Sequence, residues 1–363
     1  MHAAEGRRLQ WLLGHGVLTA LVEGAPPWRR AMRSAFITGL SGTSLTSDER
    51  TFLADVRPAG VIVFARNVAD PDQLGRLIGD ALAAIGSADT LVLVDQEGGR
   101  VQRLRPPHWR ALPGASRYRE TDAPTRNAWL IARLLADELR AVGINTNCAP
   151  VLDVPVLGAH DVIGDRAFAR EPGPVAELGR AFAEGLRAGG IVPVIKHIPG
   201  HGRATADSHF ELPRVSARRA ELAATDFAPF HDLRAEPAAM TAHVVFSDLD
   251  PDHPASTSRL VHHEVIRGDM GFDGLLMSDD LSMKALGGPM RERAEAVIAA
   301  GSDLALHCNG DLAEMVEVAA GVPTLAGAPL ARFERALATV RAGEAFDRAD
   351  AEACLATLLR LIA

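Results

Sequence analysis

The feature that most constrains the fold is a set of short, apolar, β-rich segments between residues 35 and 308, separated by stretches long enough to hold a helix. This alternation is typical of a parallel sheet covered by helices. The predicted strands are 35–40, 60–65, 90–96, 144–151, 191–198, 239–246, 274–279 and 303–308. Eight such strands, each followed by a helix, predict an α/β fold of the (β/α)8 TIM-barrel type.

The stretches between the strands carry helical periodicity. Apolar residues from Pro71 to Ile85 fall on one stripe, and Asp70 before Pro71 is a typical helix start. Residues 175–186 repeat the pattern, and Gly189 follows as a stop signal. An open doubly wound sheet is the alternative arrangement, but the sequence lacks its Gly-x-Gly-x-x-Gly phosphate loop, so the barrel is favoured.

No Pro/Gly/Ser-rich linker divides the chain, which predicts a single barrel domain over residues 32–363, with closing helices after about residue 310. Residues 1–31 are predicted to be an N-terminal extension. Arg7 and Arg8 before an apolar stretch only loosely imitate a signal peptide, because no A-x-A-like cleavage site follows. Two interpretations of this segment stay open: a disordered extension, or a start codon assigned too early.

The charge and the cysteine content indicate which classes of partner and which cellular compartment are compatible with this chain. The chain has 38 basic and 46 acidic residues, a net charge of −8, and no block of five like charges, which argues against a nucleic-acid partner. Its three cysteines form no C-x-x-C pair, which fits a reducing compartment. No apolar run is long enough to span a membrane. These features fit a cytoplasmic protein without a nucleic-acid or membrane partner. We further expect a monomer that acts on a small molecule.

Unusual polar residues follow the predicted strands, at the end where barrels carry their chemistry. The third strand ends at Asp95, with Arg103 in the adjoining loop, and the loop after the fourth strand carries Arg166. The fifth strand delivers Lys196 and His197 side by side. A rim salt bridge is the simpler interpretation of Asp95 and an arginine. A lysine and a histidine ending an apolar strand are costly to bury without a partner or substrate, so they favour a binding site.

The histidines at the end of the fifth strand and in the loop that follows it have two possible interpretations. His197, His201 and His209 suggest zinc, but the Pro199–Gly200 step precludes the helix that ligands four residues apart usually share. We therefore predict no metal and no cofactor. The second reading pairs Asp207 with His209, so that the carboxylate holds one imidazole nitrogen and the other exchanges a proton with substrate. An exposed loop Asp and His is the simpler interpretation of this pair alone.

The seventh strand ends in two adjacent carboxylates, Asp279 and Asp280. Because neighbouring side chains on a strand point to opposite faces, only one is expected to face the barrel mouth, and the other to pair with an arginine or cap the next helix. One ionised aspartate, an Asp/His pair and a polar ring suit displacement at a sugar anomeric carbon through a covalent intermediate. In this scheme a histidine replaces the usual acid/base carboxyl group.

Four segments together resemble glycoside hydrolase family 3. They are residues 95–100 (DQEGGR), 196–202 (KHIPGHG), 207–209 (DSH) and 277–283 (MSDDLSM), and the similarity extends over residues 32–320. Within the family they resemble the β-N-acetylglucosaminidases of bacterial peptidoglycan recycling. The chain ends too soon for the second α/β domain of many relatives, which places it nearer the single-domain members. Ile198 stands where the family often has Phe.

The resemblance implies a role for each singled-out side chain. Asp279 would be the nucleophile, and His209, held by Asp207, the acid/base. The side chains implied to bind the terminal N-acetylglucosamine are Asp95, Arg103, Arg166, Lys196 and His197. The implied activity removes N-acetylglucosamine from N-acetylglucosaminyl-1,6-anhydro-N-acetylmuramyl peptides in the cytoplasm.

Three alternatives stay open at this point. A histidine acid/base leaves room for an anion, so the same fold could transfer the sugar to phosphate instead of water. A catalytically silent barrel could bind muropeptides as a sensor, although intact Asp279, Asp207 and His209 argue against it. A metal-dependent deacetylase would be inhibited by a chelator, which we do not expect.

Overall fold

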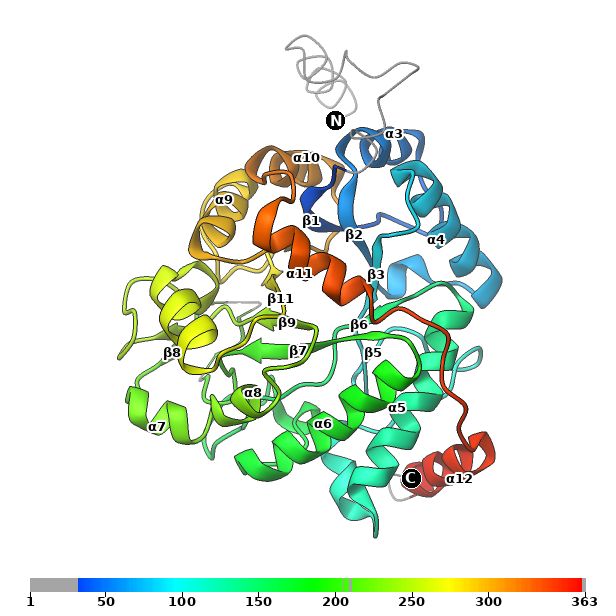
Figure 1. The fold of residues 1–363 in the computed structure, drawn as a ribbon, viewed down its shortest axis with the longest axis vertical. Coiled ribbons are helices and arrows are strands. Elements are labelled where there is room, and N and C mark those ends of the chain that lie inside the picture. Colours follow the sequence, from blue (N-terminus) through cyan, green and yellow to red (C-terminus); the bar gives the residue numbers. More distant parts are fainter. Residues whose placement is uncertain (1–31, 205, 209–210, 361–363) are drawn as a thin grey trace.

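The computed structural model describes residues 32–204, 206–208 and 211–360, and its centre is a closed barrel of eight strands (Figure 1). Every neighbouring pair in the barrel is parallel. The predicted (β/α)8 barrel is therefore confirmed, and the open sheet was the wrong alternative. In their order around the barrel the strands are β1 (Ser34–Gly39), β12 (Leu304–His307), β11 (Leu275–Asp280), β9 (Ala238–Thr241), β7 (Val192–Ile198), β6 (Thr146–Asn147), β3 (Leu91–Val94) and β2 (Pro58–Val63).

Helices surround the barrel (Figure 1). The α-helices are α3 (Ser47–Val56), α4 (Pro71–Ile85), α5 (Pro124–Ala141), α6 (Pro172–Ala188), α7 (Arg219–Ala224), α8 (Ala228–Asp232), α9 (Met290–Ala300), α10 (Leu312–Gly321), α11 (Gly327–Leu337) and α12 (Arg348–Arg360). A π-helix, η5 (Val261–Asp269), lies between β10 and β11. Shorter 3₁₀ helices are η1 (Ala65–Asn67), η2 (Ala115–Glu120), η3 (Gly164–Arg166) and η4 (Ala255–Thr257).

Helix α4 shows how the sequence specifies these elements. The side chain of Asp70 accepts a hydrogen bond from the backbone N–H of Gln73 at 2.8 Å, which satisfies one of the free donors of the first turn. Pro71 occupies the first helical position, and Gly86, with φ +72°, ends the helix. The apolar stripe is buried against the strands, so the predicted start, end and buried face are all confirmed.

Two predicted strands are shorter than expected. Of residues 144–151 only β6 is regular, because Pro150 has no N–H to donate, although Val151 still bridges to Lys196 of β7. Of residues 239–246, β9 stays in the barrel, while β10 (Val245–Phe246) pairs with β8 (Arg214–Val215) in a separate small sheet. A second small sheet, the hairpin of β4 (Gln96–Gly98) and β5 (Val101–Gln102), projects beyond the end of β3.

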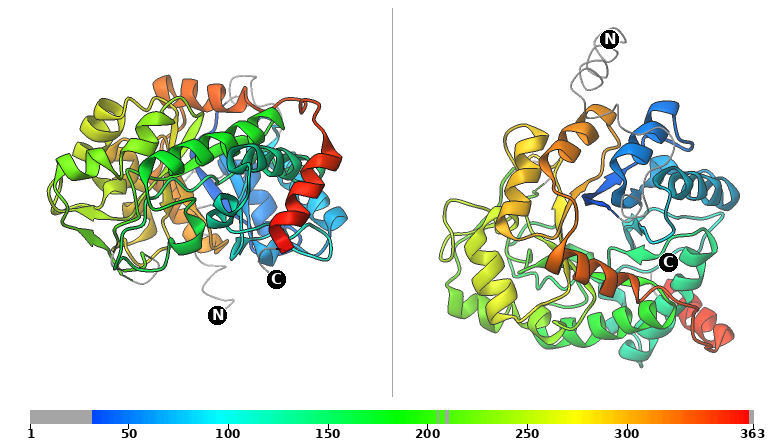
Figure 2. Two further views of the ribbon diagram at one scale, coloured as in Figure 1. Left: turned by 90° about the horizontal axis from the view of Figure 1, so that it is seen from below. Right: turned by 45° about the horizontal axis from the view of Figure 1, so that its top comes forward.

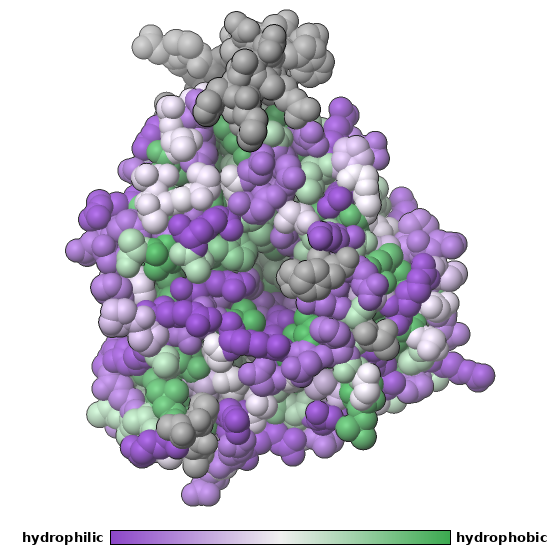
Figure 3. Space-filling view, turned by 180° about the vertical axis from the view of Figure 1, so that it is seen from behind, coloured by the Kyte–Doolittle hydropathy of each residue, from purple (hydrophilic) through white to green (hydrophobic). Residues whose placement is uncertain are grey.

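The amino ends of the barrel strands are covered by α11, which crosses in front of them in Figure 1. Phe333 and Ala336 of α11 join the cluster formed by the inward-facing strand residues. The segment that leads into α11 is held by backbone hydrogen bonds, from Ala35 N to Pro323 O and from Leu325 N to Arg33 O, both of 2.8 Å. The opposite face is hollowed near its centre, and the surface around the hollow is mostly hydrophilic (Figure 3).

The last helix, α12, packs on α5, and both views in Figure 2 show it, in red, at the side of the barrel. Ala351, Leu355 and Leu358 of α12 are buried in the same apolar cluster as the inner face of α5. The described residues after 310 thus form three helices. Helix α10 packs on α9, α11 covers the amino ends of the strands, and α12 packs on α5. Among the helices in the described part of the chain, none is both long and apolar enough to cross a membrane.

Candidate active site

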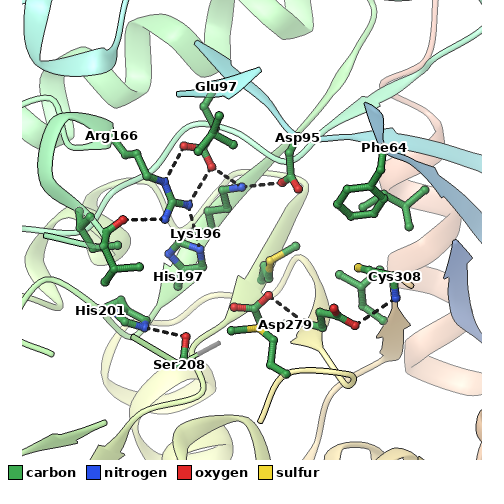
Figure 4. A pocket seen from close by; sticks show the side chains of 18 of the residues that line it. Phe64, Asp95, Glu97, Arg166, Lys196, His197, His201, Ser208, Asp279 and Cys308 are labelled. Atoms are coloured by element: carbon green, nitrogen blue, oxygen red, sulfur yellow. Dashed lines mark hydrogen bonds and ion pairs between the residues drawn. The ribbon is translucent and has the colours of Figure 1, made fainter. Parts of the chain in front are cut away.

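A pocket opens at the carboxyl ends of the barrel strands (Figure 4). Its lining comes from segments far apart in the sequence that the closed barrel brings together. The polar lining residues are Asp95, Glu97, Arg103, Arg166, Lys196, His197, His201, Ser208, Asp279 and Asp280. The apolar ones and Cys308 are Ile62, Phe64, Val101, Val162, Ile163, Met240, Met283, Leu306 and Cys308.

Two acidic and three basic side chains form a connected network on one wall of the pocket (Figure 4). The ammonium of Lys196 donates to Asp95 Oδ1 at 2.8 Å and lies 2.6 Å from Glu97 Oε1. Arg166 donates two hydrogen bonds to Glu97, from Nε to Oε2 at 2.8 Å and from Nη2 to Oε1 at 2.9 Å. Arg103 donates to the other oxygen of Asp95 at 3.1 Å. Each charge is therefore paired in a fixed geometry.

The network stays ionised at neutral pH. Burial alone would raise the pKa of Asp95, but Lys196 and Arg103 outweigh it and hold that pKa well below its ordinary value. Burial is likewise outweighed for Glu97, whose pKa is lowered by Arg166 and Lys196. The same carboxylates raise the pKa of Lys196 against the effect of burial. We call this network of Asp95, Glu97, Arg103, Arg166 and Lys196 the charged wall. It presents fixed donors and acceptors, as recognition of several sugar hydroxyls requires.

Lys196 and His197 are consecutive residues of β7, yet both line the pocket. The pairing of β7 with β9 shifts register between Lys196 and Ile198, which breaks the regular alternation of side chains at this point. The sequence prediction that both residues end this strand at the site is thus matched by their placement. Their roles toward a ligand stay predictions.

His197 is oriented by Asp153, a buried carboxylate that the sequence analysis did not single out as a site residue. Asp153 Oδ2 accepts from His197 Nδ1 at 2.7 Å, and its Oδ1 accepts from the backbone N–H groups of His197 and His201. Because a carboxylate can only accept here, Nδ1 of His197 carries the proton and Nε2 is turned toward Arg166, 3.5 Å from its Nη2. Asp153 therefore fixes the imidazole as well as the start of the following loop.

Asp279 is the penultimate residue of β11 and lies below the charged network (Figure 4). Its Oδ1 accepts the backbone N–H of Asp280 at 2.8 Å. Burial would raise the pKa of Asp279, but the imidazoles of His197 and His243, this N–H and Lys196 together lower it. Asp279 is therefore an anion at neutral pH, the state in which a carboxylate can act as a nucleophile.

Asp280 also lines the pocket, but its carboxylate is engaged by the protein. Oδ1 accepts the backbone N–H groups of Ser282 and Cys308, each at 3.0 Å, and Oδ2 accepts the Ser282 hydroxyl at 2.5 Å. The sequence predicted that only one of the two aspartates would face the barrel mouth, whereas both line the pocket. Asp280 fixes the turn after β11 rather than pairing with an arginine.

The loop that follows β7 is described only in part. His201 is buried against Ser208, with Nε2 3.3 Å from the hydroxyl, and burial lowers the pKa of this histidine to about 4. The backbone carbonyl of Ser208 accepts from Ala285 N at 3.2 Å, which joins the loop to the turn after β11. Asp207 is half-buried beside Ser208 and does not line the pocket. His209 lies outside the described residues, so the predicted Asp207–His209 pair stays a prediction.

Six of the eight predicted site residues meet in this one pocket. They are Asp95, Arg103, Arg166, Lys196, His197 and Asp279. Glu97 and Asp153 were missed as site residues. Glu97 stands two positions after Asp95, a spacing that places both on one face of an extended chain, and this signal could have found it. Nothing in the sequence pairs Asp153 with a histidine 44 positions away.

The described residues contain no group of three or more His, Cys, Asp or Glu side chains placed to hold a metal ion. What the pocket does offer is an ionised aspartate facing a wall of paired charges. This arrangement can bind a polyhydroxylated ring by its hydroxyls while a carboxylate oxygen approaches one of its carbons.

Comparisons with known proteins agree with this geometry. Residues 32–341 match the family model described as the glycosyl hydrolase family 3 N-terminal domain. A Beta-hexosaminidase of Alkalilimnicola ehrlichii is 44% identical over 279 residues, which cover 75% of this chain and 79% of the relative. One from Pseudomonas aeruginosa PAO1 is 39% identical over 307 residues, covering 84% and 91%.

Among solved structures, NagZ from Neisseria gonorrhoeae superimposes with a TM-score of 0.80 at 32% identity. The match covers 90% of this chain and 98% of that one. The same protein has been solved in complex with N-trifluoroacetyl-D-glucosamine.

Proposed function

Because the chain belongs to glycosyl hydrolase family 3 and is a glycoside hydrolase, we propose that it is a retaining exo-β-N-acetylglucosaminidase, which releases terminal N-acetylglucosamine from a saccharide. The names of its relatives support the hexosamine, as does the glucosamine derivative bound by the structurally similar NagZ. The observation that carries the mechanism is Asp279, a half-buried carboxylate held anionic near the end of β11 and facing the charged wall.

In the first step an oxygen of Asp279 attacks C1 of the bound sugar and the glycosidic C–O bond breaks. His209, held by Asp207, donates a proton to the departing oxygen, so that the aglycone leaves as a neutral alcohol. In the second step water attacks C1, His209 takes its proton back, and the bond to Asp279 breaks. Two displacements at C1 restore the original anomeric configuration.

The charged wall binds the sugar in this proposal. Asp95 and Lys196 present an acceptor and a donor side by side, and Arg166 and His197 present two more polar groups next to them. Such paired groups fit the vicinal hydroxyls of a pyranose. Since the pairs already exist without ligand, little reorganisation is needed when the sugar binds.

We extend the proposal to the physiological substrate. The motifs that resemble peptidoglycan-recycling enzymes support N-acetylglucosaminyl-1,6-anhydro-N-acetylmuramyl peptides as the saccharides cleaved, by a monomer acting in the cytoplasm without a nucleic-acid or membrane partner. Release of N-acetylglucosamine from this disaccharide peptide, and not from internal positions of a polymer, is the expected product pattern by chromatography.

The mechanism is tested with 4-nitrophenyl N-acetyl-β-glucosaminide. We expect Asp279→Ala to lower kcat by about 10⁴-fold, because the covalent step is lost. Asp273→Asn is the matched control, since Asp273 precedes the same strand at its other end and is 70% exposed. It should keep wild-type turnover. Unchanged turnover in Asp279→Ala would exclude Asp279 as the nucleophile.

A second measurement identifies the bond formed. A fluorinated slow substrate should leave a glycosyl label on the peptide that contains Asp279, detected by mass spectrometry. Assays in phosphate buffer should give free N-acetylglucosamine. Formation of N-acetylglucosamine 1-phosphate would favour the phosphorylase alternative instead.

A further inference from the structure

The pocket has two zones of different chemistry. Its charged part includes Asp95, Glu97, Lys196, His197 and Asp279. Its apolar part at the mouth includes two part-exposed valines, Val101 and Val162, which we call the valine ledge. A valine offers no hydrogen bond, so the two zones must contact different portions of a bound molecule.

The path of the chain sets the depth of the two zones. Asp95 directly follows β3, Glu97 lies on β4, and the hairpin turns at residues 99–100 before Val101 begins β5. Val101 is therefore at the tip of the hairpin, farther along it from the barrel than Asp95 and Glu97. Val162 comes from the loop between β6 and α6 and lines the same pocket.

One guanidinium holds the two halves of the valine ledge together. Arg100, next to Val101, donates from Nη2 to the carbonyls of Asp161, Val162 and Ile163 at 2.6, 2.9 and 3.1 Å. Its Nε lies 3.0 Å from Asp165 Oδ1. The loop that carries Val162 is thus fixed to the hairpin tip, and the ledge is formed before any ligand binds.

We propose that the valine ledge is the aglycone subsite and selects leaving groups that present a hydrocarbon face, such as an aryl ring or the bicyclic face of a 1,6-anhydro sugar. This inference rests on the proposed function, because it places the terminal sugar against the charged wall and Asp279. The group beyond the cleaved bond then lies toward the mouth. A hydrocarbon face gains there from burial, whereas a hydroxylated face loses hydrogen bonds to water.

The test uses Val101→Thr and Val162→Thr, which keep the side-chain shape and replace a methyl group by a hydroxyl. We compare kcat/KM for the 4-nitrophenyl glycoside with kcat/KM for N-acetyl-β-glucosaminyl fluoride, whose leaving group is too small to reach the ledge. Each variant is expected to lower the aryl value about 4-fold, the equivalent of about 0.8 kcal/mol for one methylene-sized group. The fluoride value should not change, and neither should inhibition by free N-acetylglucosamine.

Val340→Thr is the control, an exposed valine that follows α11, far along the chain from the pocket lining, and it should leave both substrates unaffected. An unchanged aryl value in both ledge variants would overturn the inference, and so would an equal fall for the fluoride. The proposed function fails separately: it is excluded if the wild-type enzyme hydrolyses neither substrate, or if Asp279→Ala still does.

Discussion

The two ends of the barrel differ in the side chains that fill their centres. At the carboxyl end, buried Glu97 and Lys196 pair with Arg166 and Asp95 around a pocket. At the amino end, the inward-facing strand residues meet Phe333 and neighbouring apolar residues of α11. Burial of hydrocarbon stabilises the fold directly, whereas buried charge pairs contribute little net stability and serve to fix geometry.

In such a barrel, residues at the amino ends of the strands contribute mainly to folding stability, and residues at the carboxyl ends contribute mainly to the chemistry. A substitution at the amino end should change the free energy of unfolding and leave the kinetics of the folded enzyme alone. A substitution in the charged wall should change both, because removal of one partner leaves another buried charge uncompensated.

The largest expected effect on stability is at the amino end. Phe333 is 2% exposed, and we expect Phe333→Ala to lower the free energy of unfolding by about 4 kcal/mol, since it removes a buried ring and leaves a cavity. Urea denaturation would measure this loss, and active-site titration would give kcat and KM of the folded fraction, which should match wild type. A changed KM would show that the two ends are not independent.

The next effect tests the charged wall. Glu97→Gln keeps the shape of the side chain but removes the charge that Arg166 and Lys196 share, so we expect a loss of about 3 kcal/mol in unfolding free energy. We also expect kcat/KM to fall about 100-fold, because both cations lose their fixed positions. Enzyme assays and urea denaturation measure the two quantities.

Glu171→Gln is the control for that prediction. Glu171 also pairs with an arginine, Arg119, at 3.1 Å, but both side chains are exposed, and such pairs contribute less than about 1 kcal/mol. If Glu97→Gln were as mild as this control in both measurements, the charged wall would have no positioning role.

The same contrast explains what the sequence could predict. The barrel and α4 follow from periodicity, because buried strands and amphipathic helices each impose a repeat on the chain. Asp95, Lys196, His197 and Asp279 were found because they interrupt apolar strands at a common end. Such residues are visible one strand at a time and need no knowledge of contacts.

Other features depend on contacts that no local pattern records. Asp153 follows an irregular stretch after Pro150 and reaches His197 only because β7 lies beside it in the barrel. The departure of β10 from the barrel was missed because residues 239–246 read as one apolar run, although the chain bends after Thr241 to pair with β8. Both the contact of Asp153 with His197 and the departure of β10 from the barrel depend on pairing between segments that are distant in the sequence.

The smallest expected effect is a loss of stability at low pH, to which a buried histidine at each end of the barrel contributes. His262 donates from Nδ1 to the carbonyl of Ser258 and accepts the Ser302 hydroxyl at Nε2, just before β12 begins, so it is buried as the neutral form. Burial lowers its pKa to about 4, as it does for His201 in the pocket. Unfolding restores the ordinary value of about 6.5, so the unfolded chain binds more protons between these values.

Stability that each histidine contributes is therefore complete above pH 6.5 and is lost as the pH falls toward 4. For His262 alone the loss at pH 5.5 is roughly 1 kcal/mol, measured as the change in unfolding free energy from its value at pH 7.5. His262→Gln should lower the stability at pH 7.5 slightly but flatten its pH dependence, without altering kcat, because His262 is outside the pocket. An unchanged pH slope in this variant would mean that His262 titrates alike in the folded and unfolded chains.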